Sequence, residues 1–153
     1  MCALGSGLAA CDSHPLAPDV GYTLLDGRAG RTAALRGQVV LVNFWATSCA
    51  PCVQAMPALV ATHHQFAPRG LQTLAVAMQH DPPAAVSHFA QTRQLPFGVV
   101  IDNTGAVARA FGDVRITPTH IVIDKRGAVA LRSVGEADLP RLHALLARLL
   151  AQA

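Results

Sequence analysis

The sequence predicts an α/β fold in which a central mixed sheet, with a parallel core and an antiparallel C-terminal hairpin, carries helices on both faces. Residues 39–45, VVLVNFW, form an uninterrupted β-prone run, which is typical of a strand buried on both faces. Strand-like and helix-like segments then alternate as far as residue 111, which favours parallel strands. Two more strand-like segments, 119–123 and 128–133, enclose the turn-forming residues 124–127 and indicate a hairpin.

The other elements follow at short intervals. In chain order, we expect strands over residues 20–25, 39–45, 71–78, 97–101, 119–123 and 128–133, and helical segments over residues 31–37, 53–66, 81–93, 106–111 and 138–150. Turn-forming residues separate these segments, such as Asp26-Gly27 after the first strand and Gly37 after the first helical turn. The pattern shows no internal repeat and no second domain.

Three helices carry signals of their own. Apolar residues recur at helical spacing in 53–66, where Pro57 predicts a kink. Asp81 is expected to cap the next helix, because aspartate suits an N-cap and proline suits the first turn that follows it. Asp138 is expected to cap the last helix in the same way, before a stripe of leucines.

Composition limits the possible functions. The chain has 153 residues, of which 52% are hydrophobic, and this is enough for the core of one domain. Its net charge is +3, but the arginines are scattered singly and only 5% of residues are aromatic, which argues against nucleic-acid binding. No apolar run reaches the roughly 18 residues of a membrane-spanning helix.

Residues 1–19 are expected to lie outside the folded domain, which would occupy residues 20–153. The segment Leu8-Ala9-Ala10-Cys11 resembles a bacterial lipobox, which would make Cys11 a site for a lipid anchor. No lysine or arginine precedes Arg28, so the basic start of a signal peptide is missing. We therefore interpret residues 1–19 as an export remnant and a proline-rich tether, and an ordinary tail remains the alternative.

The motif Cys49-Ala50-Pro51-Cys52 is the strongest functional signal. It follows the buried strand and stands where the next helix should begin, so Cys49 would face unpaired backbone N–H groups and the positive end of the helix dipole. Both features favour the thiolate, which is the reactive form of cysteine. Cys52 lies one turn further on and can close a disulfide. The histidines share no ligand spacing and no second cysteine pair follows, so we expect no metal.

The residues around this motif resemble a known family. The segment 42–52, VNFWATSCAPC, looks like the active-site segment of thioredoxin-fold proteins and, more narrowly, of TlpA/ResA-like thiol–disulfide oxidoreductases. The resemblance continues at Met56-Pro57 and at residues 116–124, ITPTHIVID, which look like the family's cis-proline loop and the strand after it. It covers about residues 20–150.

The resemblance implies a thioredoxin-like fold and a disulfide reductase that needs no cofactor. Cys49 would be the nucleophile, Cys52 the resolving cysteine and Pro118 a cis-proline beside them. The substrate would contact Thr117, Trp45, Ala50 and Pro51, with the backbone of Thr117 pairing with a substrate strand.

The resemblance also implies partners and a location. The partners would be protein thiols or disulfides and a membrane electron donor of the thiol-reductase type. We expect a periplasmic monomer, anchored to the inner membrane as a lipoprotein, and cytochrome c maturation is one task that such families perform.

Three residues depart from the family pattern. Ser48 stands where a tryptophan is common, Asn43 where thioredoxin has a buried aspartate, and Ala50 where some ResA-like proteins have a glutamate. Because an asparagine is not a base at neutral pH, no familiar carboxylate is left to move the proton of Cys52. The direction of electron flow is therefore open.

Two alternatives share the same scaffold. A thiol peroxidase of the peroxiredoxin type would need a proline ahead of its peroxidatic cysteine, and Thr47-Ser48-Cys49 has none. A copper-binding module could use the cysteine pair, but no methionine-rich segment or third-ligand pattern supports it.

Overall fold

The computed structural model describes residues 13–153, and its centre is a five-stranded sheet in the order β5-β4-β3-β6-β7. The strands are β3 (Val39–Trp45), β4 (Leu71–Ala77), β5 (Gly98–Ile101), β6 (Thr119–Ile123) and β7 (Val129–Val134). Strands β3, β4 and β5 run parallel, whereas β6 is antiparallel to β3 and β7 is antiparallel to β6. The mixed sheet with a parallel core and an antiparallel C-terminal hairpin is thus confirmed.

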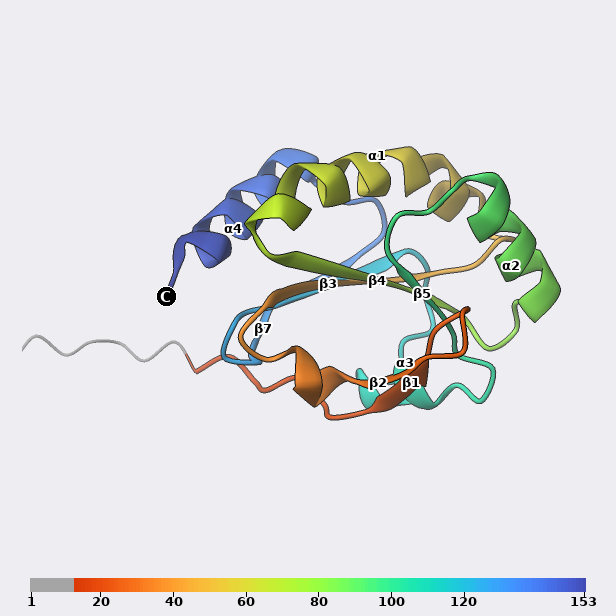
Figure 1. The fold of residues 1–153 in the computed structure, drawn as a ribbon, viewed down its shortest axis with the longest axis horizontal. Coiled ribbons are helices and arrows are strands. Elements are labelled where there is room, and N and C mark those ends of the chain that lie inside the picture. The colour runs from red at the N-terminus through yellow and green to blue at the C-terminus, as the bar shows by residue number, and fades with distance from the viewer. Residues whose placement is uncertain (1–12) are drawn as a thin grey trace, which may run out of the picture.

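Two different layers cover the sheet (Figure 1). One face carries α1 (Ala50–Phe66), α2 (Pro83–Thr92) and α4 (Leu139–Ala151). The other carries the short helix α3 (Ala106–Ala110), the hairpin β1 (Gly21–Thr23) and β2 (Ala29–Arg31), and the 3-10 turn Thr32–Leu35. The three long helices therefore lie together on one side.

Strand β3 is buried on both faces, as its unbroken apolar run predicts. Because side chains alternate along a strand, Leu41 and Trp45 pack toward α1, while Val42 and Phe44 pack toward α3. The central strand thus joins the two halves of the hydrophobic core, and its C-terminal end leads directly to the Cys-X-X-Cys motif.

The N-terminal hairpin differs from the expectation of one strand over residues 20–25. Strand β1 is shorter, and β2 pairs with it although Ala29-Gly30-Arg31 has little β propensity. Gly30 lies opposite Tyr22, and a Cβ atom at Gly30 would collide with the tyrosine ring. Close packing of an aromatic ring on a glycine therefore makes a strand that local propensity does not predict.

Helix boundaries differ in two places. Helix α1 begins at Ala50 rather than at residue 53 and continues through Pro57. The N-cap of α2 is Pro82, and Asp81 makes no capping bond, so the prediction of Asp81 as an N-cap is wrong. Its carboxylate binds Thr47 instead. The predicted cap of α4 is confirmed, because Asp138 accepts a hydrogen bond from the amide of Arg141.

Part of the expected tether belongs to the folded domain. The carbonyl of Pro15 accepts a hydrogen bond from the amide of Val129, and the amide of Ala17 donates to the carbonyl of Gly127. The domain boundary expected at residue 20 thus moves to about residue 15. The lipobox-like segment and Cys11 lie outside the described residues. No helix in the described part of the chain has the length and apolar character needed to cross a membrane.

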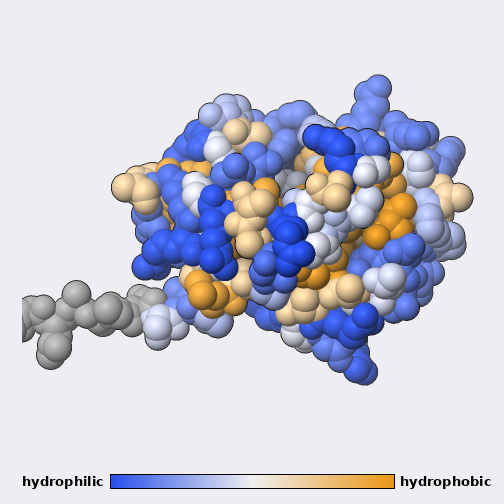
Figure 2. Space-filling view, turned by 60° about the horizontal axis from the view of Figure 1, so that its bottom comes forward, coloured by the Kyte–Doolittle hydropathy of each residue, from blue (hydrophilic) through white to orange (hydrophobic). Residues whose placement is uncertain are grey.

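The surface is mixed in character. Figure 2 shows the face that carries the N-terminal hairpin, where hydrophobic residues form patches separated by hydrophilic side chains. The large hydrophobic residues with the greatest exposure are Leu16, Ile116 and Val134. Ile116 directly precedes Thr117 and Pro118, so this exposed side chain lies next to the predicted cis-proline loop.

The cap of α4 gives a first prediction. Replacing Asp138 with alanine should lower the free energy of unfolding by about 1 kcal/mol, because the amide of Arg141 loses its acceptor. Urea denaturation measures the change. Asp138→Asn is the matched control and should keep most of the stability, since asparagine also caps helices well. Equal losses in the two variants would contradict the capping role.

Candidate active site

Cys49 is the N-cap residue of α1. The amide of Cys52 donates a hydrogen bond to the Sγ atom of Cys49 at 3.3 Å, and the amide of Val53 donates to the carbonyl of Cys49 at 3.0 Å. Cys49 and Cys52 form a disulfide with their Cα atoms 5.2 Å apart. The first cysteine thus lies where the sequence predicts it, after a buried strand and at the start of a helix.

The two sulfurs differ in access. Cys49 is half-buried, whereas Cys52 is only 3% exposed and packs in the core beneath α1. Ala50 and Pro51, which separate them, are exposed. A partner molecule can therefore reach Cys49 and its two neighbours first. When the disulfide is reduced, the N-terminal amides and dipole of α1 favour the thiolate of Cys49.

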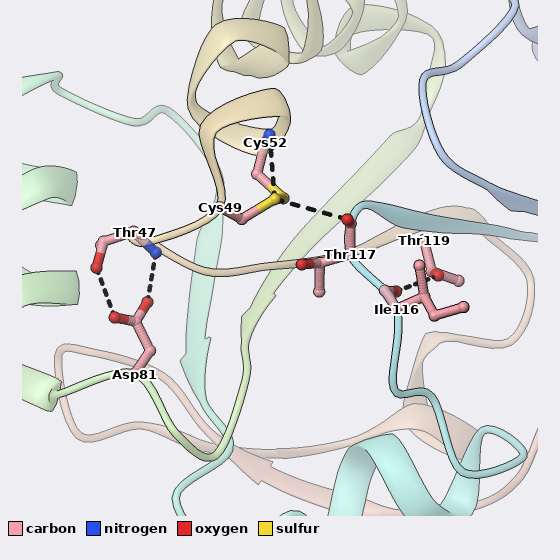
Figure 3. The surroundings of a disulfide bond; sticks show 7 residues. All are labelled: Thr47, Cys49, Cys52, Asp81, Ile116, Thr117 and Thr119. Carbon is pink, nitrogen blue, oxygen red and sulfur yellow. Dashed lines mark hydrogen bonds between the residues drawn. A yellow bond between two sulfur atoms is a disulfide. The ribbon is translucent and has the colours of Figure 1, made fainter.

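The loop before β6 packs against Cys49 (Figure 3). The peptide bond between Thr117 and Pro118 is cis, and the carbonyl oxygen of Thr117 lies 3.6 Å from the Sγ atom of Cys49. The hydroxyl of Thr119 donates to the carbonyl of Ile116 at 2.6 Å, and the amide of Gly135 donates to the carbonyl of Pro118 at 2.8 Å. These bonds fix the loop on both sides of Thr117.

Thr117 itself has unused backbone capacity. It is half-buried, and within residues 13–153 its amide donates to no acceptor. Pro118 is buried behind it. An extended peptide that approaches Cys49 would therefore meet a fixed backbone with a free donor, which is the arrangement that strand addition requires.

Asp81 is a site residue that the sequence analysis did not find. It follows β4 and is buried, and its carboxylate accepts hydrogen bonds from the amide of Thr47 at 2.7 Å and from the hydroxyl of Thr47 at 2.5 Å (Figure 3). The two bonds hold the loop between β3 and Cys49. A sequence signal existed, because parallel strands β3 and β4 end at the same edge of the sheet.

Trp45 does not lie where a substrate-binding residue must lie. Its side chain has 0% exposure, and its ring packs against that of Phe89 with centroids 5.1 Å apart. The prediction that a substrate contacts Trp45 is corrected: the residue supports the active-site loop from within the core. The physical reason is the alternation of β3, which directs Trp45 beneath α1 and α2.

A buried polar pair lies on the same face of the sheet. Asn43 on β3 pairs directly with His120 on β6, and both residues are at most 5% exposed. In the described part of the chain, the Oδ1 atom of Asn43 and both ring nitrogens of His120 have no hydrogen-bond partner. Burial lowers the pKa of His120 below its usual value, so its imidazole is neutral at pH 7.

Metal ligands do not gather anywhere in the described residues. Within residues 13–153, no group of three or more histidine, cysteine, aspartate or glutamate side chains is close enough to hold a metal ion. The cysteine pair itself forms a disulfide, a bond that can open and close.

The clamp between Thr47 and Asp81 gives the second prediction. Thr47→Val should lower the free energy of unfolding by about 1–3 kcal/mol, because the buried carboxylate of Asp81 loses one of its two donors. Thr47→Ser keeps the hydroxyl and is the matched control. Chemical denaturation measures the free energy of unfolding of both variants. Wild-type stability in both would show that the hydrogen bond between Thr47 and Asp81 does not stabilise the fold.

The buried histidine gives the third prediction. Burial lowers the pKa of His120 and also that of His63, so the unfolded chain binds more protons than the folded protein in mild acid. Stability is complete above about pH 6.5 and should decline as the pH falls toward the folded-state values, by up to about 1.4 kcal/mol per pH unit for His120 and by less for the half-buried His63.

Urea denaturation from pH 7.5 to pH 5.0 tests this dependence. The slope of unfolding free energy against pH should become shallower in His120→Gln, because the buried imidazole is then absent. His88 is exposed, so His88→Gln is the matched control and should keep the wild-type slope. An unchanged slope in His120→Gln would show that the histidine takes up its proton without loss of stability.

Comparison with known proteins agrees with this geometry. The model of the AhpC/TSA family matches residues 15–132. A thiol–disulfide oxidoreductase ResA from Geobacillus thermodenitrificans is 38% identical over 96 residues, which are 63% of this chain and 55% of the relative. The thioredoxin-like protein YneN of Bacillus subtilis is 36% identical over 91 residues, 58% of this chain and 53% of that protein. The chain thus aligns with about half the length of these relatives.

Solved structures extend the likeness to nearly the whole chain. A candidate thioredoxin from Neisseria meningitidis has a TM-score of 0.84 and 33% identity, over 92% of this chain and 93% of its own. A candidate thiol:disulfide interchange protein DsbE from Chlorobium tepidum has a TM-score of 0.79 and 29% identity, over 92% and 99% of the two chains. The chain therefore belongs to the AhpC/TSA family and has the thioredoxin-like fold, with a Cys-X-X-Cys disulfide at its centre.

Proposed function

We propose that the protein is a thiol–disulfide oxidoreductase that reduces disulfides of other proteins through the Cys49–Cys52 couple. The observation that carries the proposal is the asymmetric disulfide at the start of α1. One sulfur is accessible and bonded to a helix N-terminal amide, and the other is buried. The names of the ResA and DsbE relatives support the same class of reaction.

The reaction begins at Cys49. Its thiolate attacks one sulfur of a substrate disulfide, forms a mixed disulfide and releases the other substrate sulfur as a thiolate. Cys52 then loses its proton and attacks the Sγ atom of Cys49. This step restores the Cys49–Cys52 disulfide and releases the second substrate thiolate. Two electrons pass to the substrate, whose two sulfurs each take up a proton.

The substrate is held by backbone rather than by a deep pocket. Thr117 offers its free amide beside Cys49, and Ala50 and Pro51 form the exposed surface next to the sulfur. Small side chains at these positions, together with Ser48, leave room for varied substrate residues. Selection would then depend on an extended segment at the substrate disulfide, which pairs with the loop.

The location and partners are part of the same proposal. The lipobox-like segment supports export and a lipid anchor at Cys11, which would keep a monomer at the outer face of the inner membrane, in the periplasm. A reductase in that compartment must be recharged, so a membrane electron donor of the thiol-reductase type would supply its electrons. Apocytochromes c are one class of substrate consistent with the ResA-like resemblance.

The cysteine roles give the fourth prediction. Cys49→Ser should abolish the reduction of insulin by the protein in the presence of dithiothreitol, because no nucleophile remains at the accessible position. Cys52→Ser should instead accumulate a covalent complex with the substrate, visible by non-reducing gel electrophoresis. Ser48→Ala is the control and should retain turnover. Insulin reduction by Cys49→Ser would refute the assignment.

The direction of electron flow is tested by the reduction potential of the couple. A value near thioredoxin's, about −270 mV, supports a reductase, and a value near about −120 mV would make the protein an oxidant. Equilibration with glutathione or dithiothreitol buffers measures it.

A thiol peroxidase is the second candidate, because the AhpC/TSA family match favours it. Against it, a peroxiredoxin needs a supporting arginine at its peroxidatic cysteine, whereas within the described residues the donor to the Sγ atom of Cys49 is the amide of Cys52. Peroxide consumption by the reduced protein distinguishes the two functions. Copper titration of the reduced protein tests the copper-binding alternative, which stoichiometric uptake would support.

A further inference from the structure

The resolving step poses a problem of proton transfer that the site described so far does not solve. Cys52 must lose a proton before it attacks Cys49, yet it is 3% exposed and packs among apolar residues. Burial in apolar surroundings disfavours the thiolate. The residue nearest in place to thioredoxin's buried aspartate is Asn43, which cannot accept the proton at neutral pH.

His120 lies beside Asn43, on the face of the sheet that α1 covers. It pairs directly with Asn43, so both side chains project from the face of the sheet that α1 covers. It also follows Pro118 by two residues, about 7 Å along the strand, and the Thr117 carbonyl just before that proline touches the sulfur of Cys49. The imidazole therefore lies beneath the first turns of α1.

A pocket connects this position with the surface. It has a volume of about 210 Å³ and lies between α1 and α4, with His120 and Ala55 in its wall and Glu136 at an exposed position. Ala55 follows Cys52 by three residues, so the two lie on adjacent turns of one helix face. A space of this size with polar groups in its wall can admit water, which can carry a proton.

We propose that His120 is the proton-transfer residue for Cys52, taking up the thiol proton through water in the pocket between α1 and α4. The proposal rests on the oxidoreductase function above and holds for either direction of electron flow, because the reverse reaction must return the same proton.

The step balances without any further reactant. The Cys52 S–H bond breaks, its proton joins a nitrogen of His120, and the resulting thiolate forms the bond to Cys49 as the substrate sulfur leaves. The imidazolium then gives its proton to solvent through the pocket. Burial keeps the imidazole neutral at pH 7, as a base must be, and the thiolate beside it would stabilise the imidazolium while the pair exists.

Few other charged or titratable groups face this position. Glu136 lies in the wall of the same pocket and can pass the proton outward. His143 on α4 is turned to Thr62 of α1, with Nε2 and Oγ1 2.8 Å apart. On β7, the residue opposite His120 is Ser133, which is uncharged. Within the described residues, His120 is therefore the one titratable side chain in the wall of this pocket that is buried and without a hydrogen-bond partner.

The test follows the two thiols separately with Ellman's reagent. Cys49 of the reduced protein attacks the reagent and releases one thionitrobenzoate, and Cys52 releases the second when it closes the disulfide. In His120→Gln the second phase should be about 100-fold slower at pH 7 and should recover as the pH rises and hydroxide ionises Cys52. The first phase should stay within about twofold of wild type.

His143→Gln is the matched control, because it removes the other imidazole between the same two helices. It should leave both phases at wild-type rates. A second phase in His120→Gln with wild-type rate and pH profile would overturn the proposal, as would equal slowing of both phases.

A measurement on the wild-type protein covers the case in which His120→Gln does not fold. Nuclear magnetic resonance titration of the His120 ring should give different pKa values in the disulfide and dithiol forms, because only the dithiol form places an ionisable sulfur near it. Identical titrations would overturn the proposal. Failure of insulin reduction together with normal two-phase kinetics would instead contradict the proposed function alone.

Discussion

The burial of β3 on both faces is the constraint on which the active site depends. A strand held between α1 on one side and α3 on the other cannot shift its register without exposing a complete set of apolar side chains. Its C-terminal end is therefore fixed, and the chain passes directly from Trp45 to the N-cap of α1. The position of Cys49 follows from the packing of a strand that itself performs no chemistry. The fully buried Trp45 belongs to this support.

Two sets of hydrogen bonds, together with the packing of the core, hold the loops on either side of Cys49. Asp81 holds the loop before Cys49 through Thr47, and the bonds to Ile116 and Pro118 hold the loop that faces it. Each bond joins one of these loops to a residue at a strand end or beside the sheet, so both loops are held against the sheet (Figure 3). The sulfur of Cys49 lies between these two loops, and its surroundings are thus held in place on both sides.

Much of this arrangement could be predicted from the sequence, because the determining signals are local. The buried run of β3, the turn residues before β7 and the cap at Asp138 each act within a few residues. The missed features depend on contacts between distant segments. Asp81 has every local mark of an N-cap, but Thr47 lies 34 residues earlier and offers two donors that outweigh the cap. Likewise, β2 pairs with β1 where the ring of Tyr22 packs on Gly30. The local sequence Ala29-Gly30-Arg31 does not predict this contact.

The difference between the two sulfurs connects packing with chemistry. Partial exposure and helix N–H groups favour reaction at Cys49, whereas burial shields Cys52 from outside reagents and leaves it beside its disulfide partner Cys49. The same apolar surroundings also disfavour the thiolate, so they make it harder for Cys52 to lose its proton. In a protein that lacks the familiar carboxylates, a neutral histidine is well suited to this place. A carboxylate there would be charged before the reaction and would oppose the thiolate, whereas an imidazole becomes charged only when the thiolate forms, with the opposite sign.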